Sequence, residues 1–330
     1  MRTYQREVRE FVQWVEKERY SLSTAEEIDD ALHRYIWDGV EQSYRVSRAR
    51  AEHLLSGVER CLPRVKGKLA YSRLLLKDWQ KASPSKHTTP EPLSCAVTLG
   101  NTMGLLGFAR VGNLHVLQNL TGLRPSELLG LHREDLRPDW MTPAGQPRRA
   151  VLSLGTKERT KVGRQQWVSI DPEVDPIGAY LVGAFYLSTA PGQRLSAVAT
   201  DKEYNEVISM ATKQWGIKDL GISGHSGRAG WATRLRAMGV PFPEVRELGR
   251  WRHDALLRTY LDVIGAINLD PFVAHMNAQA NWILEDYPQR MCLWHGAPSP
   301  HLQARIATGV PVAAGCGRDP GPHSFKLQLP

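Results

Sequence analysis

The sequence predicts a mainly helical α+β fold in two domains. Apolar residues recur at helical spacing over residues 1–82 and again from residue 94 to about 285, and one hairpin-like pair of alternating segments interrupts the second stretch at 151–170. The chain has 330 residues, of which 42% are apolar and 23% charged. A chain of this size and composition can bury two hydrophobic cores.

Residues 1–82 are predicted to form a small bundle of about four helices. In "STAEEIDDALHRYIWDGVEQ", two pairs have capping-box spacing, Ser23 with Glu26 and Thr24 with Glu27, and apolar residues follow at helical intervals. Similar periodicity marks "REVREFVQWVEKE", "SRARAEHLLSGVERC" and "LAYSRLLLKDWQK". The Pro- and Ser-containing segment that follows, "KASPSKHTTPEPL", predicts a linker at residues 83–93.

The second domain is predicted to span residues 94–285. Helical patterns in "CAVTLGNTMGLLGFARVGNLHVLQNL" and "RPSELLGL" precede two alternating segments, "RAVLSLGT" and "QQWVSID". The basic, Gly-containing "KERTKVGR" separates these two segments, which predicts an antiparallel hairpin with a long loop. Toward the C-terminus Gly and Pro recur without a period, so we expect residues 296–330 to be a disordered tail.

The charge balance favours a polyanionic partner. Lys and Arg number 42 against 34 Asp and Glu, a net charge of +8, and such a surplus suits nucleic acid. The cysteines form no C-x-x-C pair and have no His at ligand spacing, so we predict no metal site, disulfide or other cofactor; they are Cys61, Cys95, Cys292 and Cys316. The N-terminus lacks the apolar core of a signal peptide and no run is long enough to span a membrane. We therefore expect a cytoplasmic or nuclear protein without a membrane partner.

The densest chemistry lies in "GHSGRAGWATRLRAMGVPFPEVRELGRWRHDALLRTYLDV", residues 224–263. Its "HSGR" segment runs from His225 to Arg228, Trp251 follows 23 residues after Arg228, and Tyr260 follows nine residues after Trp251. Breaking a phosphodiester without a metal requires a nucleophile, fixed positive charge on the phosphate oxygens and an acid for the departing oxygen. This segment contains residue types for each of these tasks.

The order and spacing of these residues resemble the C-terminal signature of the tyrosine recombinases, the phage integrase family. Upstream, "TGLRPSELLGLHREDL" resembles the first-arginine motif of that family, with Arg124 followed by Glu127. The resemblance covers about residues 1–275. It implies a helical core-binding domain that grips DNA, followed by a catalytic domain.

The resemblance also implies a role for each site residue. Tyr260 would be the nucleophile that forms a 3′-phosphotyrosine, and Arg124 and Arg228 would bind the scissile phosphate. His225 would hydrogen-bond that phosphate or take the tyrosine proton. Trp251 occupies the His-or-Trp position of the family, where an indole can only bind and pack.

Three further assignments concern the surroundings of these residues. Glu127 would orient an arginine or a histidine. The general acid would be a lysine of the hairpin loop; counting back from "WVSI" favours Lys161, and Lys157 is the alternative. The other arginines of the segment would contact flanking phosphates or solvate helix surfaces; they are Arg234, Arg236, Arg246, Arg250, Arg252 and Arg258.

The sequence thus predicts a site-specific DNA recombinase or integrase of a mobile element, which cuts and rejoins double-stranded DNA without metal or ATP. The resemblance implies a homotetramer on two DNA sites. Two alternatives remain open at this point. One is a type IB topoisomerase-like relaxase, and the other is a catalytically silent relative that only binds DNA or regulates.

Overall fold

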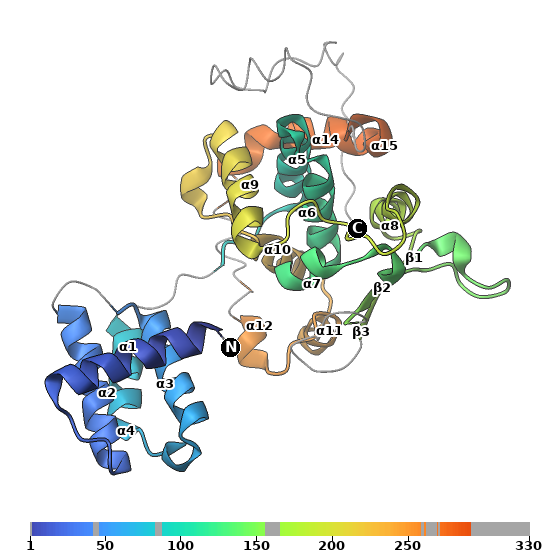
Figure 1. The fold of residues 1–330 in the computed structure, drawn as a ribbon. Helices are drawn as coiled ribbons and strands as arrows, with labels where there is room; N and C mark the ends of the chain where they lie inside the picture. The colour runs from blue at the N-terminus through green and yellow to red at the C-terminus, as the bar shows by residue number, and fades with distance from the viewer. Residues whose placement is uncertain are drawn as a thin grey trace. The chain divides into compact units, whose positions relative to one another are not determined.

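The computed structural model describes residues 2–41, 46–82, 88–155, 166–258, 261, 269 and 271–291. The chain divides into two compact units, residues 1–86 and residues 87–330. Helices make up most of the described residues and one small antiparallel sheet accompanies them, so the predicted α+β class is confirmed (Figure 1).

The first unit is a bundle of helices with its own hydrophobic core. Its helices are α1 (Arg2–Glu18), α2 (Ala25–Glu41), α3 (Arg48–Cys61), the short 3₁₀ turn η1 (Pro63–Val65) and α4 (Ala70–Ala82). Phe11, Ile28, Leu32, Leu54 and Leu69 are all buried in that core, which contains side chains from the first three helices and the approach to α4. The helical spacing of these apolar residues along the sequence therefore corresponds to buried faces.

Side-chain caps set the starts of two of these helices. At α2, the Glu27 carboxylate accepts from the backbone N–H of Thr24 at 3.1 Å and the Thr24 hydroxyl accepts from the Glu27 N–H at 3.1 Å. The capping box therefore forms between Thr24 and Glu27, one of the two predicted pairs. Buried Asp29 of α2 accepts from the backbone N–H groups of Tyr71 and Ser72, which fixes the first turn of α4 against α2.

The second unit contains the remaining helices and the sheet. Its α-helices are α5 (Leu93–Met103), α6 (Ala109–Thr121), α7 (Pro125–Gly130), α8 (Pro176–Ser188), α9 (Asp201–Gln214), α10 (Ser226–Ala237), α11 (Phe242–Leu248), α12 (Asp254–Arg258), α14 (Asn277–Glu285) and α15 (Tyr287–Arg290). Shorter helical turns are the π turn η2 (Gly104–Phe108) and the 3₁₀ turns η3 (Arg133–Asp135), η4 (Asp139–Met141), η5 (Lys218–Leu220) and η6 (Ala274–Met276).

Helices α5 and α6 form the centre of this unit and cross at close range. An added Cβ at Gly112 would lie 2.1 Å from the carbonyl oxygen of Gly100, so both positions admit only glycine at this approach. The residues between the two helices form the turn η2, in which Gly107 adopts a left-handed φ of 93°. The single helical stretch of the sequence is therefore two helices packed side by side (Figure 1).

The sheet has three antiparallel strands in the order β1 (Leu136–Arg137), β2 (Ala150–Leu154) and β3 (Gln166–Ile170). Ala150 pairs with Ile170 and Leu154 with Gln166, which is the predicted hairpin. The loop of that hairpin, with Lys157 and Lys161, lies outside the described residues. Strand β1 is only two residues long, too short to give an alternating pattern in the sequence.

None of the described helices combines the length and the apolar composition that a membrane crossing requires. The C-terminal residues for which a disordered tail was predicted, 296–330, lie outside the described ranges, so that prediction stays untested.

Candidate functional site

A short turn after helix α11 collects the two predicted phosphate-binding arginines. The carbonyl oxygen of Gly249 accepts a hydrogen bond from Nη2 of Arg228, and the carbonyl oxygen of Arg250 accepts from Nη2 of Arg124 at 3.1 Å. The next residue is Trp251. Two guanidinium groups from different helices, α10 and the start of α7, are thus held by consecutive peptide carbonyls.

Arg124 stands at the N-cap of α7, between the left-handed Gly122 that ends α6 and Pro125, the first residue of α7. Its backbone N–H donates to Oε2 of Glu127 at 2.9 Å, and its Nη1 donates to Oε1 of the same carboxylate. The side chain of Arg124 is 19% exposed. Glu127 therefore fixes both the backbone and the guanidinium of Arg124.

Glu127 binds a second arginine that the sequence did not single out. Nη2 of Arg250 lies 2.7 Å from Oε2 of Glu127, and both side chains are buried. Burial by itself would raise the pKa of Glu127, but the charge of Arg250, the N–H of Arg124 and the charges of Arg124 and Arg228 outweigh it and lower that pKa. The carboxylate is therefore ionised at neutral pH and bridges two cations.

Arg228 is the most deeply buried of these groups, with 1% exposure. Besides Gly249, it donates through Nη1 to the carbonyl oxygen of Gly122 at the C-terminus of α6. Its guanidinium carbon lies 4.1 Å above the ring of Trp251, a cation–π contact. The Trp251 ring in turn stacks on Trp231 with the centroids 6.1 Å apart. The buried Trp251 ring therefore packs between Arg228 and Trp231.

His225 is the N-cap residue of α10 and is exposed, while Arg228 lies three residues further along the same helix. The two residues therefore frame the first turn of α10, His225 at its N-cap and Arg228 inside it.

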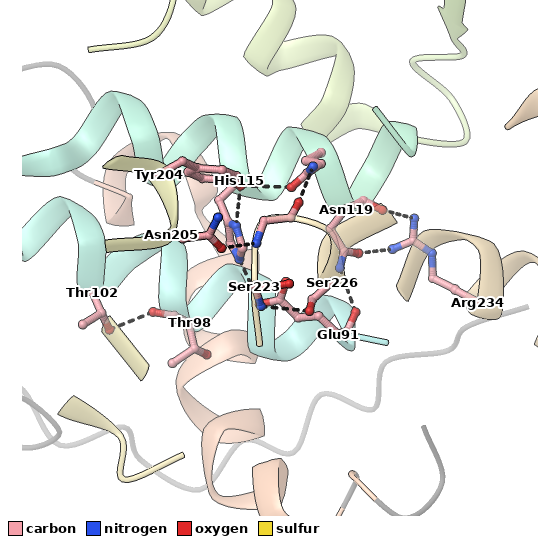
Figure 2. A network of polar contacts seen from close by, with 12 residues as sticks. Glu91, Thr98, Thr102, His115, Asn119, Tyr204, Asn205, Ser223, Ser226 and Arg234 are labelled. Atoms are coloured by element: carbon pink, nitrogen blue, oxygen red, sulfur yellow. Dashed lines mark hydrogen bonds and ion pairs between the residues drawn. The ribbon is translucent and has the colours of Figure 1, made fainter. Parts of the chain in front are cut away.

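A buried polar network holds the first turn of α10 in place (Figure 2). His115 lies between Tyr204 and Glu91, with Nδ1 2.7 Å from the tyrosine hydroxyl and Nε2 2.9 Å from the Glu91 carboxylate. The Glu91 N–H donates to the carbonyl of Ser226 at 3.2 Å, and Asn119 donates to the carbonyl of Glu91 at 2.8 Å. Because Ser226 directly follows His225, helices α6 and α9 fix the position of the candidate site through this network.

Four of the predicted site residues are thus brought together, namely Arg124, Glu127, Arg228 and Trp251. Tyr260, Lys157 and Lys161 lie outside the described residues, so their predicted roles stay predictions.

Sequence reasoning missed the part that Arg250 plays. It grouped Arg250 with arginines that contact flanking phosphates or solvate helix surfaces, whereas the structure buries its side chain against Glu127. The contact between Arg250 and Glu127 joins residues that are far apart in the sequence, so no local sequence pattern predicts it. The carbonyls of Gly122 and Gly249 were missed for the same reason. The one available signal was the Gly-Arg pair, Gly249 and Arg250, directly before Trp251.

No three His, Cys, Asp or Glu side chains gather into a possible metal site among the residues that the structure describes.

The chain was compared with protein-family models, curated proteins and solved structures. No protein-family model and no curated protein matches the chain. Among solved structures, a crystal structure of XerA recombinase aligns with a TM-score of 0.39 and 17% sequence identity, over 82% of this chain and 91% of that chain. The function is therefore argued below from the residues of this chain.

Proposed function

We propose that this protein is a tyrosine recombinase, which cleaves and rejoins DNA strands through a covalent 3′-phosphotyrosine on Tyr260. The observation that carries the proposal is the anchoring of Arg124 and Arg228 on the consecutive carbonyls of Arg250 and Gly249. The turn that holds both guanidinium groups is followed by Trp251, and Tyr260 lies nine residues further along the chain. Two fixed guanidinium groups, together with a tyrosine nearby in the sequence, supply the residue types that phosphoryl transfer to tyrosine needs.

The proposed reaction conserves the phosphodiester energy. The phenol oxygen of Tyr260 attacks phosphorus and its proton passes to His225, while the bond to the 5′ oxygen breaks and a loop lysine, Lys161 or Lys157, protonates that oxygen. Arg124 and Arg228 stabilise the charge on the non-bridging oxygens in the transition state. Attack of a 5′ hydroxyl on the phosphotyrosine reverses these steps, so religation needs no ATP.

Burial adds a requirement to this proposal. Arg228 is 1% exposed, so DNA binding has to uncover its guanidinium before a phosphate oxygen can reach it. The two donors of Arg228 that rest on the carbonyls of Gly122 and Gly249 hold the group in one orientation. Such preorganisation is what transition-state stabilisation demands.

In the same proposal, the helical unit of residues 1–86 also binds DNA, and the net charge of +8 supports binding of a polyanion. Exchange between two DNA sites would require a homotetramer.

The first prediction tests the nucleophile. The full chain is incubated with a random-sequence pool of duplexes that each carry a nick, so that a released fragment diffuses away and prevents religation. We expect wild-type protein to retain DNA after denaturation and Tyr260→Phe to retain none, because the variant lacks only the attacking oxygen.

The matched control is Tyr71→Phe, at an exposed tyrosine of α4, which should trap DNA as the wild type does. Equal trapping by Tyr260→Phe, or none by the wild type, overturns the proposed function. If the wild-type protein forms adducts and relaxes supercoiled plasmid but yields no recombinant products, the proposed cleavage chemistry stands. The protein is then assigned to the type IB topoisomerase-like alternative.

A further inference from the structure

Arg250 adopts a backbone conformation that arginine disfavours. Its φ is 61°, in the left-handed region, and among the described residues other than glycine only Arg19 shares a positive φ. Glycine adopts this conformation without strain, whereas a side chain with a Cβ does so at a cost in free energy. Strain of this kind is typical of positions where the side chain or the carbonyl has a task.

The guanidinium of Arg250 is only partly used by the protein. Its side chain is 8% exposed and Nη2 binds Glu127 at 2.7 Å. Nε and Nη1 are buried and have no hydrogen-bond partner among the described residues. Buried donors of a charged group are normally satisfied, so two donors left without an acceptor call for a ligand.

The position of Arg250 suggests the class of that ligand. Its carbonyl holds Arg124, and the neighbouring carbonyl of Gly249 holds Arg228. Three guanidinium groups therefore surround one turn, with Glu127 as the single carboxylate that these contacts include. An excess of fixed positive charge with free N–H donors fits an anion with several acceptor oxygens, such as a phosphate.

We propose that Arg250 is a third phosphate-binding arginine of the site, whose Nε and Nη1 bind an oxygen of the phosphodiester while Nη2 remains on Glu127. The inference rests on the proposed function, because it assumes that Arg124 and Arg228 bind the same phosphodiester. It assigns the strained backbone to a specific purpose. The left-handed turn lets residue 250 offer its carbonyl to Arg124 and its side chain to Glu127 at once.

The decisive variant is Arg250→Gly, which removes the guanidinium and relieves the backbone. The control is Arg137→Gly, which makes the same change of residue type at an exposed arginine of strand β1 in the same unit. Both variants are compared with wild type on the duplex recovered as a covalent adduct from the random pool. The rate of adduct formation by Arg250→Gly should fall about 100-fold, as on removal of one transition-state donor, and that of Arg137→Gly should not change.

A second substrate separates phosphate binding from support of Glu127. In a duplex with a methylphosphonate at the scissile position, one charged oxygen is replaced by a methyl group, so fewer positive charges are needed. We expect the deficit of Arg250→Gly to shrink to less than about 10-fold on this substrate, since the missing guanidinium has less charge to neutralise. An equal deficit on both substrates shows that Arg250 acts only through Glu127 and overturns the inference, as does a variant as fast as wild type.

A binding measurement makes the result independent of cleavage. In wild-type protein labelled with ¹⁵N-arginine, the Nε–H signal that disappears in Arg250→Gly should shift when inorganic phosphate is added. If this Nε–H signal shifts but the protein forms no covalent adduct with DNA, Arg250 is supported as a phosphate-binding residue and the proposed recombinase activity is refuted. An unmoved signal overturns the inference even where the adduct forms.

Discussion

At the scale of single residues, Glu127 organises the site because one carboxylate binds two guanidinium groups. Oε1 accepts from Arg124, while Oε2 accepts from Arg250 and from the backbone N–H of Arg124. Removing one member of a buried ion pair leaves an unpaired charge, which is strongly destabilising. The sequence indicated the Arg124–Glu127 pair through its helical spacing, but the second arginine is 123 residues away.

Glu127→Gln is expected to lower the free energy of unfolding of the second unit by about 3–5 kcal/mol at neutral pH, because the amide cannot neutralise Arg124 and Arg250. The folded state lowers the pKa of Glu127 below its ordinary value of 4.5. The stability due to the ionised carboxylate is therefore complete above that value, and it is lost as the pH falls through the lower, folded-state pKa.

Urea unfolding of wild type and Glu127→Gln at a series of pH values checks this prediction. The difference in free energy of unfolding between wild type and Glu127→Gln should be constant above pH 4.5 and become smaller in more acidic solution. The control Glu173→Gln removes the same charge at an exposed position and should unfold as wild type does. A difference that does not depend on pH would refute the electrostatic role of Glu127.

At the scale of elements, the position of α10 decides where His225 and Arg228 lie. The helix packs against the segment that leads into α5, and an added Cβ at Gly230 would lie 1.8 Å from the carbonyl oxygen of Glu91. That carbonyl is itself fixed by Asn119 of α6. Neither the backbone of Glu91 nor its partner can move without disturbing the network shown in Figure 2.

Gly230→Ala should therefore destabilise the second unit by at least about 1–3 kcal/mol, the usual range for overpacking. Gly104→Ala is the matched control, because its new Cβ would meet its nearest neighbour at 3.7 Å, an ordinary contact. Thermal unfolding of the two variants measures the effect. A midpoint for Gly230→Ala equal to that of the control would show that α10 is free to shift and would contradict the packing described here.

The elements also show what the sequence could and could not predict. Periodicity predicted the helices and the β2–β3 hairpin, since apolar residues recur every three to four positions in the helices and every second position in the strands. Strand β1 was not predicted because it is two residues long. The turn η2 was not predicted because helical periodicity continues through it. The left-handed Arg250 could not be predicted, because its conformation is stabilised by contacts with α7 and not by neighbours in the sequence.

At the scale of the whole molecule, the two units have separate hydrophobic cores. The core around Ile28, Leu32 and Leu54 belongs wholly to residues 1–86, while the one around Leu99, Leu114 and Phe185 belongs to the second unit. A unit with its own core can fold by itself.

The fragment of residues 1–86 should consequently fold when expressed alone, with a cooperative thermal transition. The ¹H–¹⁵N NMR spectrum of the fragment is the measurement, and we expect dispersed amide signals. The free energy of unfolding of a fragment with Leu32→Ala should be lower by about 2–5 kcal/mol, because the substitution opens a cavity in that core. A collapsed spectrum for the parent fragment would show that residues 1–86 depend on the rest of the chain.

The most direct test of the central claim identifies the residue that carries the DNA. The covalent adduct formed on nicked duplex is digested with nuclease and trypsin, and the nucleotide-bearing peptide is sequenced by mass spectrometry. We predict a single modified residue, Tyr260, linked to the 3′ phosphate of the remaining nucleotide. A nucleotide linked to a different side chain, or through a 5′ phosphate, would contradict the account.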